Sequence, residues 1–206
     1  MFLYHGTSSK HLDFILKNGI QPTSTTGVIS HWDIASASDR VYLTDTYATH
    51  YAIASAMELD YDDEGIEKEE QIDYDAVIFK VKVDEADFIP DEDFLAQFLR
   101  KPSGDIEKDT KFYRDTLDVI YEPSKIQELG LLSLEHLGTV CVPSIKPEDI
   151  IEYTVLPNKK LVEIIMTESD PTVSITHHKL IGCSYKEDLK SLRDRYETFE
   201  VTKQDD

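Results

Sequence analysis

The chain has 206 residues, of which 40% are hydrophobic and 30% are charged, and its formal net charge at pH 7 is −20. This length and composition are typical of one compact soluble domain, and no apolar stretch approaches the roughly 20 residues that a membrane-spanning helix needs. The negative charge argues against broad nucleic-acid binding, because it would repel the phosphate backbone.

The first residues lack the basic and apolar segments of a signal peptide, which predicts a cytoplasmic protein without a membrane partner. Cys141 and Cys183 have no metal-ligand spacing, so we expect two reduced thiols. His177 and His178 are adjacent and would point to opposite faces of a strand, so we expect no metal site.

Acidic residues are concentrated in residues 58–75 and again in residues 84–93. Such charge blocks are usually solvated loops, and we expect that here. The alternative is a surface that mimics nucleic acid or docks a basic partner.

The amino-terminal third alternates short strands and helices. Residues 2–5 predict a strand, and a helix follows with Leu12, Ile15 and Leu16 on one face, which Ser8 or Ser9 can cap and Gly19 can end. Residues 23–38 are rich in Ser and Thr, which is typical of a mobile loop that could fold over a ligand.

A second strand is predicted at residues 41–43, and Thr44 or Asp45 can cap the helix after it. That helix has a tyrosine-containing face formed by Tyr47, Ala48, Tyr51, Ala52 and Ser55. Apolar residues alternate with Lys80 and Lys82 over residues 77–83, which predicts a strand with one solvated side.

Residues 92–137 contain three helical stretches broken by Pro102, Gly104 and Pro123, and we expect a helical insertion there. Strands are predicted at 139–142, 151–156 and 161–166, and an extra strand and helix at about 175–200. No repeat or linker divides the chain, so residues 1–206 are expected to form a single α+β domain.

The order of motifs over residues 3–54 resembles that of a known enzyme family. His5-Gly6-Thr7 on a strand is followed by a helix ending Asn-Gly, by Ile-x-Pro, by Val-Tyr-Leu-Thr-Asp around Tyr42, and by Ala-x-x-Tyr-Ala around Tyr51. This order is similar to that of the ADP-ribosyltransferases of the poly(ADP-ribose) polymerase and diphtheria-toxin branch, which is known by a His-Tyr-Glu triad. Beyond Ala54 only the strand order is similar.

The resemblance implies two packed antiparallel-rich sheets with flanking helices, and NAD as co-substrate. His5 would bond a ribose hydroxyl, Gly6 would bind the nicotinamide carboxamide through its backbone, and Thr7 would add a hydroxyl contact. Tyr42 and Tyr51 match the family's two tyrosines on the nicotinamide side, where an aromatic face on a pyridinium gains about 0.5–2 kcal/mol. Tyr47, one helical turn before Tyr51, could share or replace that role.

The triad's glutamate is displaced in this sequence. The family places it at the start of a late strand, and the corresponding position here is Gly138 or its neighbour. Glu135 is the nearest carboxylate and our candidate for the catalytic acid, with the alternatives Glu122, Glu128 and Glu148. Without an acid at the ribose, the protein would bind NAD or ADP-ribose with little turnover.

The sequence is compatible with three functions. The first is mono-ADP-ribosyl transfer to an unidentified acceptor, a protein rather than a nucleic acid, in a setting that the family's range allows to be toxin or defence. The second is a non-enzymatic acidic interaction or inhibitor protein on the same fold. The third is an RNA 2′-phosphotransferase, which is disfavoured because no arginine adjoins the His-Gly-Thr motif.

Overall fold

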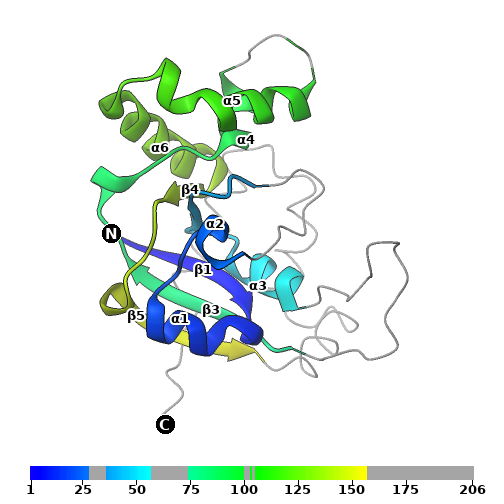
Figure 1. The fold of residues 1–206 in the computed structure, drawn as a ribbon, viewed down its shortest axis with the longest axis vertical. Helices are drawn as coiled ribbons and strands as arrows, with labels where there is room; N and C mark the ends of the chain where they lie inside the picture. Colours follow the sequence, from blue (N-terminus) through cyan, green and yellow to red (C-terminus); the bar gives the residue numbers. More distant parts are fainter. Residues whose placement is uncertain (28–35, 57–73, 100–102, 104, 157–206) are drawn as a thin grey trace.

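The computed structural model describes residues 1–27, 36–56, 74–99, 103 and 105–156, shown in colour in Figure 1. They form an α+β structure, as expected. The strands are β1 (Phe2–Ser8), β2 (Val41–Thr44), β3 (Ala76–Lys82), β4 (Thr139–Val142) and β5 (Ile150–Leu156). The α-helices are α1 (Leu12–Asn18), α2 (Thr23–Thr26), α3 (Ala48–Ala56), α4 (Glu92–Phe98), α5 (Ile106–Ile120) and α6 (Pro123–Leu137), with 3-10 helices η1 (Ser9–His11), η2 (Glu85–Asp87) and η3 (Pro147–Asp149).

All five described strands belong to one antiparallel sheet with the order β4-β2-β1-β3-β5. The expectation of two packed sheets is therefore wrong for this part of the chain. The reason is that helices, rather than a second sheet, bury both faces of the strands. The strand predicted at 161–166, and the extra strand and helix predicted at about 175–200, lie outside the described residues.

One face of the sheet carries the main hydrophobic core. Leu3, Leu43 and Phe79, from three neighbouring strands, are each at most 1% exposed. Ile15 of α1 and Leu134 of α6 pack against the same core, so these two helices cover this face. We call it the α1 face.

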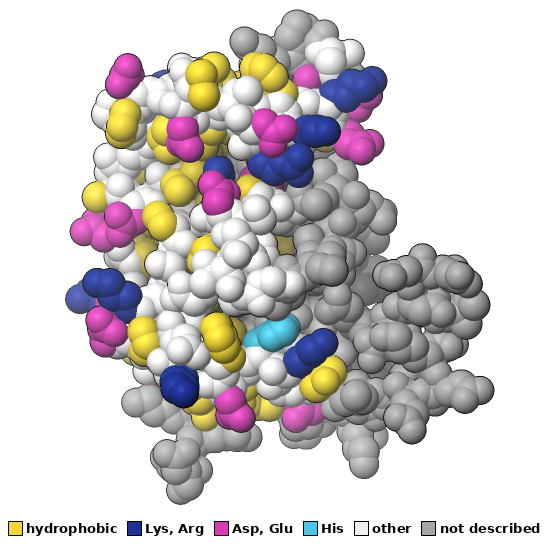
Figure 2. Space-filling model, in the orientation of Figure 1, with side chains coloured by type: hydrophobic (Ala, Val, Ile, Leu, Met, Phe, Trp, Pro, Cys, Tyr) yellow, Lys and Arg dark blue, Asp and Glu magenta, His cyan; other side chains and the backbone are white. Residues whose placement is uncertain are grey.

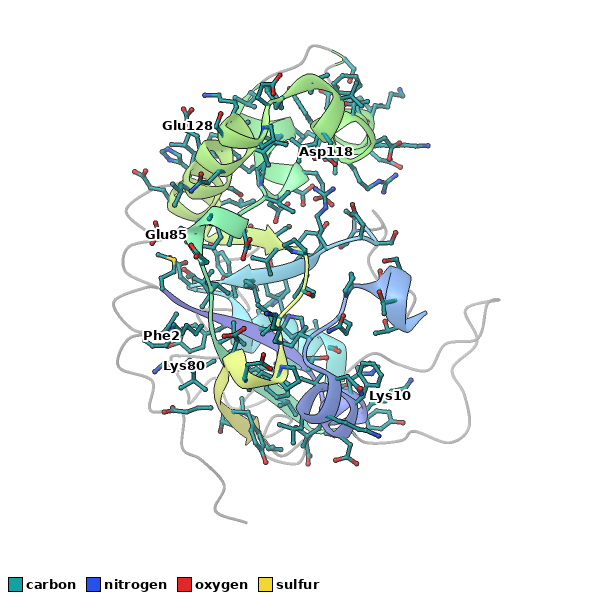
Figure 3. All side chains as sticks on the ribbon, turned by 60° about the vertical axis from the view of Figure 1, so that its left-hand side comes forward. Phe2, Lys10, Lys80, Glu85, Asp118 and Glu128 are labelled. Atoms are coloured by element: carbon teal, nitrogen blue, oxygen red, sulfur yellow. The ribbon has the colours of Figure 1, made fainter. Side chains whose placement is uncertain are left out.

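The opposite face is covered in part by α3, and we call it the α3 face. Ala48 and Ala52 of α3 are fully buried against Ala76 and Ile78 of β3. The prediction that β3 has one solvated side therefore holds only at its carboxyl-terminal end, around Lys80 and Lys82. There Lys80 and Phe2 lie side by side, with the Lys80 Nζ 5.2 Å from the centre of the Phe2 ring (Figure 3).

The helical insertion is confirmed. Helices α4, α5 and α6 lie together beside β4 (Figure 1) and share a second core built around Leu95, Tyr113 and Leu129. Asp91 caps α4 by accepting the Asp93 N–H, and Asp105 caps α5 in the same way through Lys108. None of the described helices combines the length and the apolar composition that crossing a bilayer requires.

The termini of α1 were predicted in part. Gly19 ends the helix at φ 77°, a left-handed conformation that a residue without a Cβ adopts at little cost. Ser8 precedes η1 without a side-chain cap bond, and the Ser9 Oγ instead accepts the N–H of Asp75, 3.0 Å away. Within residues 23–38, the first four form α2, and residues 28–35 lie outside the described part.

Candidate functional site

The sheet is weakly joined between β1 and β2. β1 pairs with β3 at seven successive positions, from Phe2 with Lys82 to Ser8 with Ala76. With β2 it pairs at one position, Tyr4 with Thr44. The edge of β1 beyond Tyr4, which carries the His5-Gly6-Thr7 motif, therefore runs beside β2 without a continuous ladder.

His5 bridges this junction. Its Nδ1 lies 3.0 Å from the backbone O of Tyr42. Because a carbonyl oxygen only accepts, Nδ1 carries the proton, and in the neutral ring Nε2 is left as an acceptor. Burial lowers the pKa of His5, with His11 adding to the effect and the Tyr42 bond opposing it, so the ring is neutral at pH 7.

The ring of His5 and the phenol of Tyr42 do not share a face of the sheet. His5 is the cross-strand partner of Phe79 and so lies on the α1 face, whereas Tyr42 is the partner of Cys141 on the α3 face. The structure brings the His5 ring to the Tyr42 backbone only. A ligand contacting both side chains must therefore enter between β1 and β2.

Gly6 has a packing role that the sequence did not reveal. A Cβ at this position would stand 2.0 Å from the O of Ala48 and 2.5 Å from the N of Ala52. Both are backbone atoms of α3, so the helix can approach β1 this closely only over a glycine. Thr7 follows it and is 7% exposed.

The two tyrosines of the α3 region have different environments. Tyr47 is 4% exposed and stands just before α3, where its N–H bonds the Oγ1 of Thr44 at 2.9 Å. Tyr51 is partly exposed on α3, with its ring 5.6 Å from that of His50 in an edge-to-face arrangement. Of the two residues, Tyr51 is the less buried.

Tyr42 is bonded to an acid that the sequence analysis did not single out. Its hydroxyl donates to the Oε1 of Glu92 at 2.5 Å and accepts the N–H of Ala37 at 2.7 Å. The Ala37 N–H also reaches the Glu92 Oε1 at 3.2 Å. Glu92 is 4% exposed, and its second oxygen, Oε2, is buried without a hydrogen-bond partner.

Asp91, the residue before Glu92, ties the two acids to the start of β4. Its Oδ2 accepts the hydroxyl of Thr139 at 2.7 Å, and its N–H donates to the Oγ of Ser133 at 3.1 Å. Burial, together with the charges of Glu92 and Asp93, raises the pKa of Asp91 to about 7. Burial raises the pKa values of Tyr42 and Tyr51, and acids add to this effect: Glu92 and Asp91 for Tyr42, and Asp91 and Asp93 for Tyr51.

The expected glutamate position is unsuited to a glutamate in this chain. Gly138 ends α6 at φ 79°, and its carbonyl accepts the Thr44 hydroxyl at 2.6 Å. Glu135 is exposed on the last turn of α6. The alternatives are also exposed: Glu122 precedes α6, Glu128 pairs with Lys125, and Glu148 lies in η3.

A weak signal for Glu92 is present in the sequence. It lies in the acidic run 84–93, which was expected to be solvated. The structure divides that run, because Asp84, Glu85 and Asp87 are exposed whereas Asp91 and Glu92 are buried. A proline before the pair and an apolar helix after it indicate a helix start, but not which way the acids point.

An open groove of about 820 Å³ is present at the amino-terminal end of β1, lined among others by Met1, Asp84, Lys82 and Lys146. None of His5, Tyr42, Tyr51 or Glu92 lines it. Among the described residues no group of three potential metal ligands occurs, and His177 and His178 lie outside them.

The chain was also compared with known proteins. No family model and no curated protein matches it.

Proposed function

We propose that this chain binds NAD⁺ at the junction of β1 and β2 and transfers its ADP-ribose to an acceptor, releasing nicotinamide. The observation that carries the proposal is the bond from the His5 Nδ1 to the Tyr42 backbone, 3.0 Å long, across strands that pair at only one position. It joins the two motifs of the resemblance and presents the Nε2 of His5 as an acceptor for a ribose hydroxyl.

The reaction requires a site that tolerates developing positive charge. The bond between the ribose C1′ and the nicotinamide nitrogen breaks, and its electron pair stays on nicotinamide, which becomes neutral. The ribose is left as an oxocarbenium ion, as in glycoside cleavage. The acceptor's lone pair then forms the new bond to C1′, and the acceptor's proton passes to solvent.

The described residues supply groups suited to each part of this substrate. At Gly6, β1 forms no bridge with β2, and this strand edge is where we place the nicotinamide carboxamide. The ring of Tyr51 offers a π-face to the cationic pyridinium, and the neutral His5 adds no charge that would oppose the cation.

The test is incubation of the full chain with NAD⁺ labelled in its adenosine half, with and without cell lysate. We expect nicotinamide release, and label transfer when the acceptor is present. His5→Ala is expected to lower the rate about 100-fold or more, by analogy with loss of one transition-state hydrogen bond. The control His136→Gln changes a ring stacked against Phe94 and Phe98 in the helical insertion and should retain the wild-type rate.

Tyr51 provides a second readout, by calorimetric titration with NAD⁺. Tyr51→Phe keeps the π-face and should bind normally, whereas Tyr51→Ala should bind about 5- to 30-fold more weakly, which corresponds to about 1–2 kcal/mol. A wild-type protein that neither binds nor cleaves NAD⁺ would refute the proposal.

The acidic interaction protein is the second candidate. The described part of the face in Figure 2 carries Lys and Arg interspersed with Asp and Glu, rather than one block of negative charge. The acidic run centred on residues 58–73 lies outside the described residues. The phosphotransferase reading remains the weakest, because Arg40 is 5% exposed and pairs with its neighbour Asp39, and Arg114 lies on α5.

A further inference from the structure

Glu92 has a buried oxygen whose desolvation no protein group compensates. A carboxylate oxygen without a hydrogen bond loses its hydration on folding and regains nothing, at a cost of one to several kcal/mol. Asp91, its neighbour, has partners on both oxygens, from Thr139 and from the N–H of Asp93. Hydrogen bonds therefore compensate the burial of the Asp91 carboxyl group, whereas no hydrogen bond compensates the burial of the Glu92 Oε2.

The position of Glu92 relates it to the proposed site. Its other oxygen holds the hydroxyl of Tyr42, whose backbone carbonyl receives the His5 ring. The bond between Asp91 and Thr139 fixes the pair of acids beside Gly138, where the resemblance places a glutamate and this chain has a left-handed glycine. Glu92, at the start of α4, therefore lies next to Gly138, the position before β4 at which the resemblance places a glutamate.

From this we infer that Glu92, rather than Glu135, is the carboxylate of the proposed reaction, with its Oε2 accepting a hydroxyl of the nicotinamide ribose. The inference rests on the proposed function. A carboxylate bonded to that hydroxyl stabilises the oxocarbenium ion more than it stabilises neutral ribose, so it lowers the barrier to cleavage more than it strengthens binding. The bond from Tyr42 holds the carboxylate in one orientation.

The same contacts close off the Glu92 carboxylate from solvent. The N–H of Ala37 donates to both the Tyr42 hydroxyl and the Glu92 Oε1, so the backbone at Ala37 lies against the pair. Because Oε2 is inaccessible in this structure, the backbone at Ala37 or the start of α4 must shift before a ribose hydroxyl reaches it.

The test compares Glu92→Gln, Glu135→Gln and Glu107→Gln in the full chain. Each replaces a carboxylate by an amide of nearly equal size, and Glu107 is an exposed acid in the first turn of α5. Nicotinamide release at saturating NAD⁺ gives kcat, and calorimetry gives Kd. We expect Glu92→Gln to lower kcat about 100-fold or more with Kd changed less than about threefold, and the other two to match wild type.

A structural role for Glu92 would lower the melting temperature and weaken binding without that selective loss of kcat. Loss of kcat in Glu135→Gln with normal kcat in Glu92→Gln would overturn the inference and leave the proposed function standing. If the wild-type protein does not bind NAD⁺, both the inference and the proposed function are wrong.

If Glu92→Gln fails to fold, the wild-type protein can be titrated with NAD⁺ lacking the 2′-hydroxyl of the nicotinamide ribose, and with NAD⁺ lacking its 3′-hydroxyl. We expect one of the two to be cleaved about 100-fold more slowly than NAD⁺ while its Kd changes less than about threefold, as for Glu92→Gln. Equal rates of nicotinamide release from NAD⁺ and both analogues would contradict a bond from Oε2 to this ribose.

Discussion

Tyr42 and Glu92 lie fifty positions apart in the chain and are joined by a hydrogen bond of 2.5 Å from the phenol to a buried carboxylate oxygen. The bond connects strand β2 to the first turn of α4, and so links the helical insertion to the sheet. It also gives the tyrosine of the resemblance an acidic neighbour that its local sequence does not contain.

Tyr42→Phe should lower the free energy of unfolding by about 1–3 kcal/mol, because it removes a donor from a buried carboxylate and leaves the N–H of Ala37 as its remaining partner. Urea denaturation measures the loss. Tyr153→Phe, at a ring packed 5.8 Å from Phe79, is the matched control and should change stability by less than about 0.5 kcal/mol. Equal losses in the two variants would show that the Tyr42 bond adds nothing specific.

Gly6→Ala should destabilise the protein by about 3 kcal/mol, because the new methyl group overlaps the backbone of α3 at Ala48 and Ala52. Gly27→Ala is the comparison: nothing lies within 4 Å of its Cβ position, and its φ of 72° costs about 1 kcal/mol. Thermal unfolding followed by circular dichroism distinguishes them. A Gly6→Ala protein as stable as wild type would mean that α3 does not pack this closely on β1.

Thr44→Val should cost at least about 2 kcal/mol. The Thr44 hydroxyl donates to the O of Gly138 and accepts the N–H groups of Thr46 and Tyr47, and valine leaves those buried groups short of a partner. Thr116→Val removes a single hydroxyl bond to Phe112 near the surface of α5 and should cost less than about 0.5 kcal/mol. Chemical denaturation of both variants checks the difference, and a Thr44→Val loss no larger than that of Thr116→Val would contradict it.

Asp91 should make the protein less stable as pH rises from about 4 to about 7. Its carboxyl group has a folded-state pKa of about 7, raised by burial and by the charges of Glu92 and Asp93. In this range the unfolded chain has lost the proton and the folded protein retains it, so the free energy of unfolding falls by up to about 4 kcal/mol. Below pH 4 both states are protonated and the effect disappears.

Asp91→Asn removes this titration. The free energy of unfolding of the variant, relative to that of wild type, should therefore increase between pH 4 and pH 7.5. The weakened contact with Thr139 lowers the stability of the variant by the same amount at every pH and does not change this trend. Urea denaturation at several pH values gives both curves. Parallel curves for the two proteins would show that Asp91 titrates near its ordinary pKa in the folded state.

Periodicity in the sequence was sufficient to place most of the elements. The strands β1 to β5 and the helices α4 to α6 occur where the patterns predicted them, because alternation and helical spacing depend on near neighbours in the chain. Local signals also identified Gly19 as a helix end. They failed for Ser8 and Ser9, since the partner of the Ser9 hydroxyl is Asp75, sixty-six positions away.

By itself, the sequence determined the α+β class of the described part and the motif of His5, Tyr42 and Tyr51. Only the tertiary structure decided that the strands form one sheet, that Gly6 is needed for the approach of α3, and that Asp91 and Glu92 are buried while Asp84 and Glu85 are exposed. The physical reason is that burial, hydrogen-bond partners and pKa depend on groups brought together from distant positions. Glu92 meets Tyr42 only after the insertion has packed against the sheet.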